Sequence, residues 1–177
     1  MFVAPDIDRR KAEEILSRRE GMVPRRRKII KTELLWLPLY VFEVLLEDSK
    51  GARLKDLVSV DGIKGEFALY RETAFAGEPP RSGNQGEFII GNSGAREAAS
   101  REYLRMLHNN NMRKRNPVTV ISFSEPVHVF YPYWIGYHTR RSGYDFEAID
   151  AVSGGKQGVR MKPVFIDLIL QITGKMA

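Results

Sequence analysis

The sequence predicts an α+β fold made of two tandem repeats, each a helix followed by an antiparallel meander, with a further helix at the C-terminus. Helical and alternating apolar patterns follow one another twice, and a stretch rich in glycine and proline separates the halves. The chain has 177 residues, of which 43% are hydrophobic and 28% are charged, as is typical of a globular protein. The predicted first repeat covers 1–75, the connector 76–94, and the second repeat with the C-terminal helix 95–177.

The first repeat begins with a helix predicted over Arg9–Glu20, with Asp6 or Asp8 as its N-terminal cap, because a short carboxylate accepts from the free N–H groups of the first turn. The apolar segment 28–47 carries Pro38 in its middle, and proline inside a helix costs about 3 kcal/mol. This segment therefore predicts two strands, or one strand bent at Pro38. Turn residues separate it from strands predicted at 55–60 and 66–72.

The connector leads into a second helix, predicted from Ala95 to His108 with Asn92 or Ser93 as its cap. Residues 87–90, just before it, predict a short strand. The remaining strands are predicted at 117–124, 127–138 and 144–151. A C-terminal helix is predicted at 163–173, because proline is tolerated at the first helical position and glycine follows the last.

Two short segments recur in the two halves. Residues 37–41 (LPLYV) match 131–135 (YPYWI) at an offset of 94, and residues 60–65 (VDGIKG) match 149–154 (IDAVSG) at an offset of 89. Their order, each after a predicted helix, favours one unit used twice over a chance similarity between apolar strands. The prediction is that residues 8–72 and 95–160 share one topology, with Pro38 over Pro132 and Asp61 over Asp150.

A helix followed by a meander that ends in Asp-x-x-x-Gly resembles PepSY-type and cystatin-like domains. Residues 150–154 (DAVSG) fit the Asp-Ala-x-Ser/Thr-Gly pattern of that family, whereas residues 61–65 (DGIKG) lack its hydroxyl residue. The resemblance implies a mostly non-catalytic module, of a kind often linked with binding or restraining peptidases. Many members are exported or attached to membranes, and this chain shows no segment of that kind.

The Asp of this motif has a structural role available to it. A carboxylate at the start of a turn accepts from N–H groups two residues on, and the glycine takes the positive φ. A catalytic role for Asp61 or Asp150 is the alternative.

The sequence lacks the residues that several classes of function require. Because the chain has no cysteine, disulfides, thiol nucleophiles and Cys-ligated metals are excluded. His128 and His138 lie roughly 33 Å apart on a straight strand, too far to share a metal ion. No hydrolase or phosphate-loop motif is present, so we predict no enzyme and no cofactor, with a hydrolase lacking a readable motif as a third hypothesis. Without a signal peptide or a membrane-length apolar segment, the expected location is cytoplasmic.

The apolar strands and the C-terminal helix predict a binding surface. A meander covered by one helix needs only one apolar face, yet the segments 34–44 and 127–137 are apolar on both. The second cover is the other repeat, the C-terminal helix, a second subunit or a ligand. We therefore predict a non-enzymatic binding or assembly module that engages a protein or peptide partner, or a second copy, through sheet faces or edges. Its candidate contact residues are Trp36, Tyr40, Phe130, Tyr131, Tyr133, Trp134, Tyr137, Phe165 and Ile169.

The basic residues support an alternative function. The 28 Lys and Arg exceed the 22 Asp and Glu, giving a net charge of +6. Two basic runs precede strands at corresponding places of the two halves, so they predict a surface for a polyanion, either nucleic acid or anionic lipid, unless they are ordinary solvated loops. The residues concerned are Arg25, Arg26, Arg27, Lys28, Arg113, Lys114 and Arg115.

Overall fold

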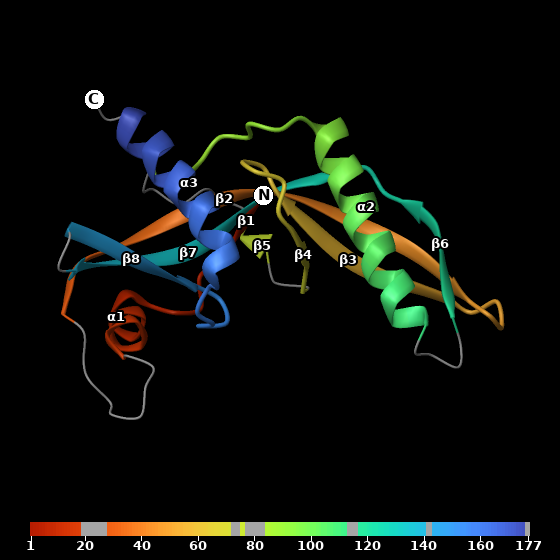
Figure 1. Cartoon of the computed structure of the whole chain (residues 1–177), viewed down its shortest axis with the longest axis horizontal. Coiled ribbons are helices and arrows are strands. Elements are labelled where there is room, and N and C mark those ends of the chain that lie inside the picture. The colour runs from red at the N-terminus through yellow and green to blue at the C-terminus, as the bar shows by residue number, and fades with distance from the viewer. Residues whose placement is uncertain (19–27, 72–74, 77–83, 113–116, 141–142, 176–177) are drawn as a thin grey trace. The chain divides into compact units, whose positions relative to one another are not determined.

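The computed structural model describes residues 1–18, 28–71, 75–76, 84–112, 117–140 and 143–175 (Figure 1). Along the chain its elements are β1 (Phe2–Val3), α1 (Arg9–Ser17), β2 (Ile29–Asp48), β3 (Arg53–Asp61), β4 (Phe67–Leu69), β5 (Phe75–Ala76), α2 (Asn92–Asn111), β6 (Val118–Phe123), β7 (Val127–Arg140), β8 (Gly143–Asp150), a short 3-10 helix η1 (Val159–Met161) and α3 (Lys162–Lys175). The fold is α+β and includes a C-terminal helix, as predicted. Its sheet is mixed, because β1 runs parallel to β7 whereas β2, β3 and β4 pair antiparallel.

The chain divides into two compact units. Unit 1 comprises Met1, Pro38–Ala74 and Glu87–Val129, and unit 2 comprises Phe2–Leu37, Phe75–Gly86 and Phe130–Ala177. Each unit therefore combines segments from both sides of the predicted connector at 76–94. The strands β2 and β7 each contribute one part to each unit.

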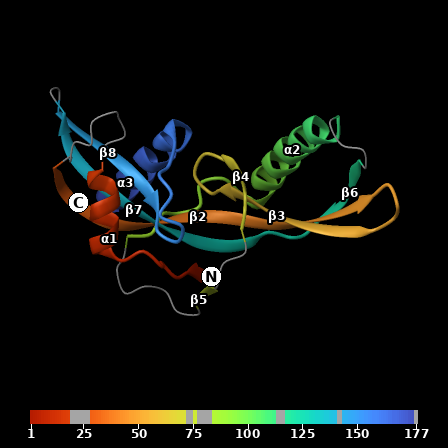
Figure 2. The same cartoon turned by 90° about the horizontal axis from the view of Figure 1, so that it is seen from below.

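In unit 1, helix α2 covers one face of a sheet formed by β3, β4, β6 and the second part of β2 (Figure 2). The alternate residues Tyr40, Phe42 and Val44 of β2 are buried in this core, as expected where one face of a strand packs on a helix. The helix presents mostly alanine to them, including Ala95 and Ala99. Small residues on the helix leave room for large side chains on the strand.

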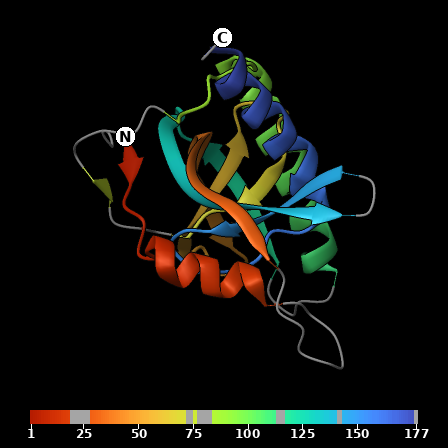
Figure 3. The ribbon, with the colours of Figure 1, turned by 90° about the vertical axis from the view of Figure 1, so that its left-hand side faces the viewer.

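In unit 2, β7 pairs with β8 from Tyr133↔Asp150 to Arg140↔Gly143. Helices α1 and α3 lie on opposite sides of this pair (Figures 1 and 3). Trp134 packs against the cluster that α1 forms with β8, whereas the ring of its neighbour Tyr133 lies 5.0 Å from that of Phe165 on α3. Neighbouring residues of a strand face opposite ways, so both apolar faces of β7 are covered, and α3 supplies the second cover.

The second half of the chain does not form the predicted meander. Strand β6 pairs with β2 and not with β7, with register Val44↔Phe123 and Asp48↔Val118. The reason lies in Ser124, whose amide donates to the carbonyl of Glu43 and whose hydroxyl accepts from the amide of Glu43. These bonds hold the end of β6 on β2.

The helices also pack on strands from the opposite half of the chain. Helix α1, from the first half, contacts β8, and helix α2, from the second half, contacts β3. The prediction that each helix covers the strands that follow it in the sequence is wrong for α1 and holds only in part for α2, which also contacts β6. Neighbourhood in sequence does not determine which apolar helix face packs on which sheet.

Several local predictions can be compared with the structure. Segment 29–48 is one strand through Pro38, and Asp8 caps α1 by accepting from the amide of Lys11. Helix α2, however, is capped by Gly91 without a side-chain bond. The predicted strand at 87–90 is absent from these described residues. The first helix ends at Ser17, with Arg18 as its C-cap, earlier than predicted, and the predicted last residue, Glu20, lies outside the described residues.

Candidate functional site

The nine aromatic and aliphatic residues predicted to contact a partner are mostly inside the fold. Trp36, Tyr40, Tyr131, Tyr133 and Phe165 are buried, and Phe130, Trp134, Tyr137 and Ile169 are half-buried. Helices α1, α2 and α3 cover the strands that carry most of them. These side chains therefore belong mainly to the interiors of the two units, and among the residues that the structure describes they do not form an open aromatic surface.

Trp134 shows how such a residue acts in the scaffold. Its indole Nε1 donates to the carbonyl of Ile7 at 2.7 Å, just before the cap of α1. In unit 1, the hydroxyl of Tyr40 donates to the carbonyl of Ile90 at 2.6 Å, just before the cap of α2. In both units a polar aromatic residue of a strand thus fixes the start of the helix that covers it.

We expect Trp134→Ala to lower the free energy of unfolding by about 3–4 kcal/mol, because it removes a large ring from the core together with its hydrogen bond. Trp134→Phe removes mainly the hydrogen bond and should cost about 1–2 kcal/mol. Urea unfolding followed by far-ultraviolet circular dichroism measures both, with Tyr40→Phe as the matched variant in unit 1. A loss below about 1 kcal/mol for Trp134→Ala would contradict a scaffold role.

The turns at Asp61 and Asp150 use their carboxylates in the same structural way. Asp61 accepts from the amides of Ile63, Lys64 and Glu66 at 3.0, 2.7 and 2.5 Å. Burial raises the pKa of Asp61, although these three amides act in the opposite direction. With both oxygens occupied by the backbone, Asp61 has the geometry of a turn residue and not that of an exposed acid or base.

Asp150 likewise accepts from the amides of Val152 and Ser153 at 2.8 and 3.1 Å, and from the hydroxyl of Tyr131. The glycines that end the two turns, Gly65 and Gly154, have φ of 81° and 75°, a conformation that favours glycine. The sequence therefore indicated the structural role of both Asp residues correctly.

Each turn also holds the segment that leads into a helix. The carbonyl of Gly62 accepts from the amides of Ile89 and Ile90, and the carbonyl of the corresponding Ala151 accepts from the amides of Asp6 and Ile7. The amides of Gly62 and Ala151 in turn donate to the carbonyls of Pro38 and Pro132. The two units thus use one bonding scheme at matching positions.

Tyr137 lies on β7 beside the first residues of β2. Its hydroxyl donates to the Glu33 carboxylate, whose other oxygen pairs with Lys31 at 2.5 Å, and the Lys31 Nζ lies 5.6 Å from the Tyr137 ring centroid. Burial, followed by the bond to Glu33, raises the pKa of Tyr137. Tyr137 therefore remains a protonated donor at neutral pH and is unsuited to act as a general base.

Helix α3 presents an apolar outer face. Val164, Phe165, Leu168 and Ile172 are buried, but Ile166 and Leu170, one turn apart, keep 42% and 62% of their surface exposed. Asp167 is the only charged residue of the sequence between positions 163 and 174. The exposed part of α3 is therefore aliphatic over more than one turn, and we call Ile166 and Leu170 the α3 face.

Most residues of the predicted polyanion surface lie outside the described part of the chain. Arg25, Arg26 and Arg27 lie outside the described residues, as do Arg113, Lys114 and Arg115. Lys28 is described and exposed.

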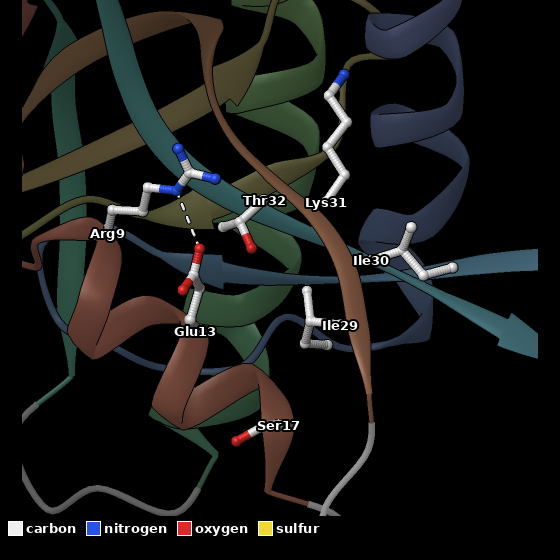
Figure 4. Close-up of a pocket in the computed structure, with 7 residues that line it drawn as sticks. All are labelled: Arg9, Glu13, Ser17, Ile29, Ile30, Lys31 and Thr32. Atoms are coloured by element: carbon white, nitrogen blue, oxygen red, sulfur yellow. Dashed lines mark hydrogen bonds and ion pairs between the residues drawn. The ribbon is translucent and has the colours of Figure 1, made fainter.

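A small cleft opens between α1 and the first residues of β2 in unit 2, with a volume of about 160 Å³ (Figure 4). Arg9 and Glu13 face it from α1, paired through Arg9 Nε and Glu13 Oε1 at 2.9 Å. Thr32 lines it from β2. The full set of lining residues is Arg9, Glu13, Ser17, Ile29, Ile30, Lys31 and Thr32.

Sequence reasoning missed this cleft. Its one local signal is Thr32, a polar residue that is buried in a strand otherwise rich in apolar core residues. The cleft is formed by α1 and β2 together, so this signal alone does not show which element lies opposite Thr32.

No metal site or membrane-spanning helix can be built from the residues that the structure describes. They contain no cluster of three or more His, Cys, Asp or Glu side chains placed to hold a metal ion. None of their helices is long and apolar enough to cross a membrane. Comparisons with protein-family models, curated proteins and solved structures found no match.

Proposed function

We propose that this chain is a non-enzymatic binding or assembly module and that the α3 face, Ile166 and Leu170, is the centre of its protein contact. The observation that carries the proposal is the exposure of these two aliphatic side chains on a helix whose other side is buried in unit 2. Each Å² of apolar surface removed from water contributes about 25 cal/mol.

The α3 face alone is too small for a stable interface, which buries about 800 Å² on each partner. Interfaces concentrate their binding energy in a few apolar side chains near the centre, surrounded by a polar rim. The α3 face has the character of such a centre, with Thr173 and the half-buried Gln171 at its side. The first partner to test is a second copy of the chain, because an apolar face can pair with itself around a two-fold axis.

We expect the protein to self-associate at micromolar concentration in high salt, and Leu170→Lys to make it monomeric. Lysine is a good helix former and is favourable near the end of a helix, so α3 should remain folded. Sedimentation velocity at several concentrations measures the association, and high salt suppresses contacts between charges. A matched control is Leu104→Lys, which places the same charge on α2 at an apolar residue that is 49% exposed.

Two outcomes would contradict this proposal. One is a wild-type chain that stays monomeric at every concentration, because the α3 face would then remain exposed to water and make no contact between copies. The other is an equal effect of Leu170→Lys and Leu104→Lys, which would place the contact elsewhere. Binding of nucleic acid or of anionic vesicles whose affinity falls steeply with salt would favour the polyanion alternative.

We further propose that the two units derive from one helix-and-strand unit used twice, with the helices exchanged between the halves. The support is the set of matching backbone bonds around the two turns. Pro132 and Asp150 of unit 2 follow Pro38 and Asp61 of unit 1 by 94 and 89 residues, whereas the helix-leading Ile7 of unit 2 precedes Ile90 of unit 1 by 83. Matching bonds at matching positions are hard to explain by two unrelated apolar strands.

A further inference from the structure

We propose that the cleft between α1 and β2 binds a small oxyanion, namely a phosphate or the phosphoryl group of a phosphomonoester. The proposal does not depend on the α3 face. It rests on the donors that converge on the cleft, on one buried hydroxyl without a partner, and on the balance of charge around the cleft.

Arg9 supplies the principal donors. Only its Nε is used, in the bond to Glu13, and its two terminal NH₂ groups have no partner among the residues that the structure describes. Figure 4 shows the guanidinium above the cleft on the side of Thr32. A guanidinium fork of this kind matches the oxygens of a phosphate or carboxylate. The bond to Glu13 engages Nε and leaves both NH₂ groups available, on a side chain that is 66% exposed.

Thr32 supplies the second observation. Its side chain is only 6% exposed, and its Oγ1 has no hydrogen-bond partner within the described part of the chain. A buried hydroxyl left unpaired costs about 1–3 kcal/mol, so most such groups in folded proteins are paired. Thr32 lines the cleft, and its hydroxyl is directed into the space between α1 and β2 in Figure 4. A bound oxyanion would complete this hydrogen bond.

The charges around the cleft leave a small positive excess. Arg9 and Lys31 among the lining residues, with Lys28 beside them, give three positive charges, against two negative charges from Glu13 and Glu33. Lys31 acts through its field and not as a direct ligand, because its Nζ pairs with Glu33 at 2.5 Å. Lys28 stands one residue before the lining segment and is exposed. Ile29 and Ile30 give the cleft an apolar side, which can accept the carbon part of a phosphomonoester.

The test is isothermal titration calorimetry of the full-length protein with inorganic phosphate, and separately with glycerol 3-phosphate, at constant ionic strength. Arg9→Gln should weaken binding at least tenfold, because a charge-assisted pair is lost. Arg10→Gln is the matched control: it removes the same charge from an exposed neighbour on α1 that does not line the cleft. It should change the affinity less than twofold.

Thr32→Val separates a binding role from a structural one. Valine has nearly the same shape and removes the unpaired hydroxyl, so the variant should unfold at an equal or higher urea concentration than the wild type. We expect it nevertheless to bind phosphate about tenfold more weakly. Loss of affinity without loss of stability is an outcome that a purely structural Thr32 would not produce.

The two probes identify the source of the anion. Tighter binding of glycerol 3-phosphate means a phosphomonoester, in contact with the isoleucines, and equal binding means free phosphate. The proposal is overturned if neither probe binds, if Arg9→Gln and Arg10→Gln weaken binding equally, or if Thr32→Val leaves the affinity unchanged.

Discussion

Asp61→Ala is expected to lower the free energy of unfolding by about 3–5 kcal/mol, the largest loss that we predict for a single substitution. The variant deprives three backbone amides of their acceptor at once, those of Ile63, Lys64 and Glu66. An unpaired buried donor costs about 1–3 kcal/mol, and the carboxylate itself is 1% exposed. The turn also carries the carbonyl of Gly62, which holds the segment before α2. Urea unfolding at neutral pH measures the loss.

The matched variant is Asp150→Ala in unit 2, for which we expect about 1–2 kcal/mol. Asp150 accepts from two backbone amides, of which that of Ser153 belongs to an exposed contact. In the variant a water molecule can accept from the Ser153 amide in place of the lost carboxylate, at little cost. The loss for Asp61→Asn should lie between these two. The asparagine oxygen still accepts from a backbone amide, but its NH₂ group would face the remaining amides, which are also donors. Equal losses at Asp61 and Asp150 would show that burial does not determine the cost.

The sequence was informative where the structure depends on short stretches of chain. The cap of the first helix could be narrowed to Asp6 or Asp8, and the segment around Pro38 could be predicted as extended chain, because the chemistry of a cap and of Pro38 is local; the structure selects Asp8 and a single strand. The turn roles of Asp61 and Asp150 follow from the same local rules. The need for a second cover over β7 also followed from its pattern, since an apolar residue at every position of a strand requires two partners.

Long-range choices could not be predicted. The pairing of β6 with β2 depends on the bonds between Ser124 and Glu43, which are 81 residues apart. The packing of α1 on β8 and of α2 on β3 depends on which apolar helix face fits which sheet. The burial of Trp36 and Tyr133 likewise depends on residues distant in sequence, since the ring of Trp36 packs on that of Phe2 and the ring of Tyr133 on that of Phe165.

The candidate sites show the same limit. The α3 face could be expected in outline, because a helix this apolar must bury one side, but only the fold shows which residues remain outside. The cleft at Thr32 could not be expected at all. It depends on an approach of α1 to β2 that no spacing in the sequence encodes.

Gly136→Ala is expected to destabilise the protein by about 1–3 kcal/mol, through crowding against Leu16 on α1. A Cβ at Gly136 would lie 2.8 Å from Leu16 Cδ1 and 3.3 Å from its Cβ, and Leu16 is completely buried. In unit 1 the corresponding strand position, by the offset of 94, is Phe42, and the corresponding helix position, by the offset of 83, is Ala99. One unit thus combines a small strand residue with a large helix residue, and the other combines the reverse.

This size compensation predicts a strong coupling between Gly136 and Leu16. Leu16→Ala alone should cost about 2–5 kcal/mol, because it leaves a cavity. In the double variant the methyl group added at residue 136 meets no crowding and fills part of that cavity. The total loss in the free energy of unfolding should therefore be smaller than the sum of the two single losses by about 1 kcal/mol or more. Gly158→Ala is the control: its φ is −76° and a Cβ there would meet nothing within 4 Å, so it should be nearly neutral and additive with Leu16→Ala. Additive losses for Gly136→Ala and Leu16→Ala would show that the helix moves to relieve the contact, and that the packing of α1 on β7 is not fitted to this pair.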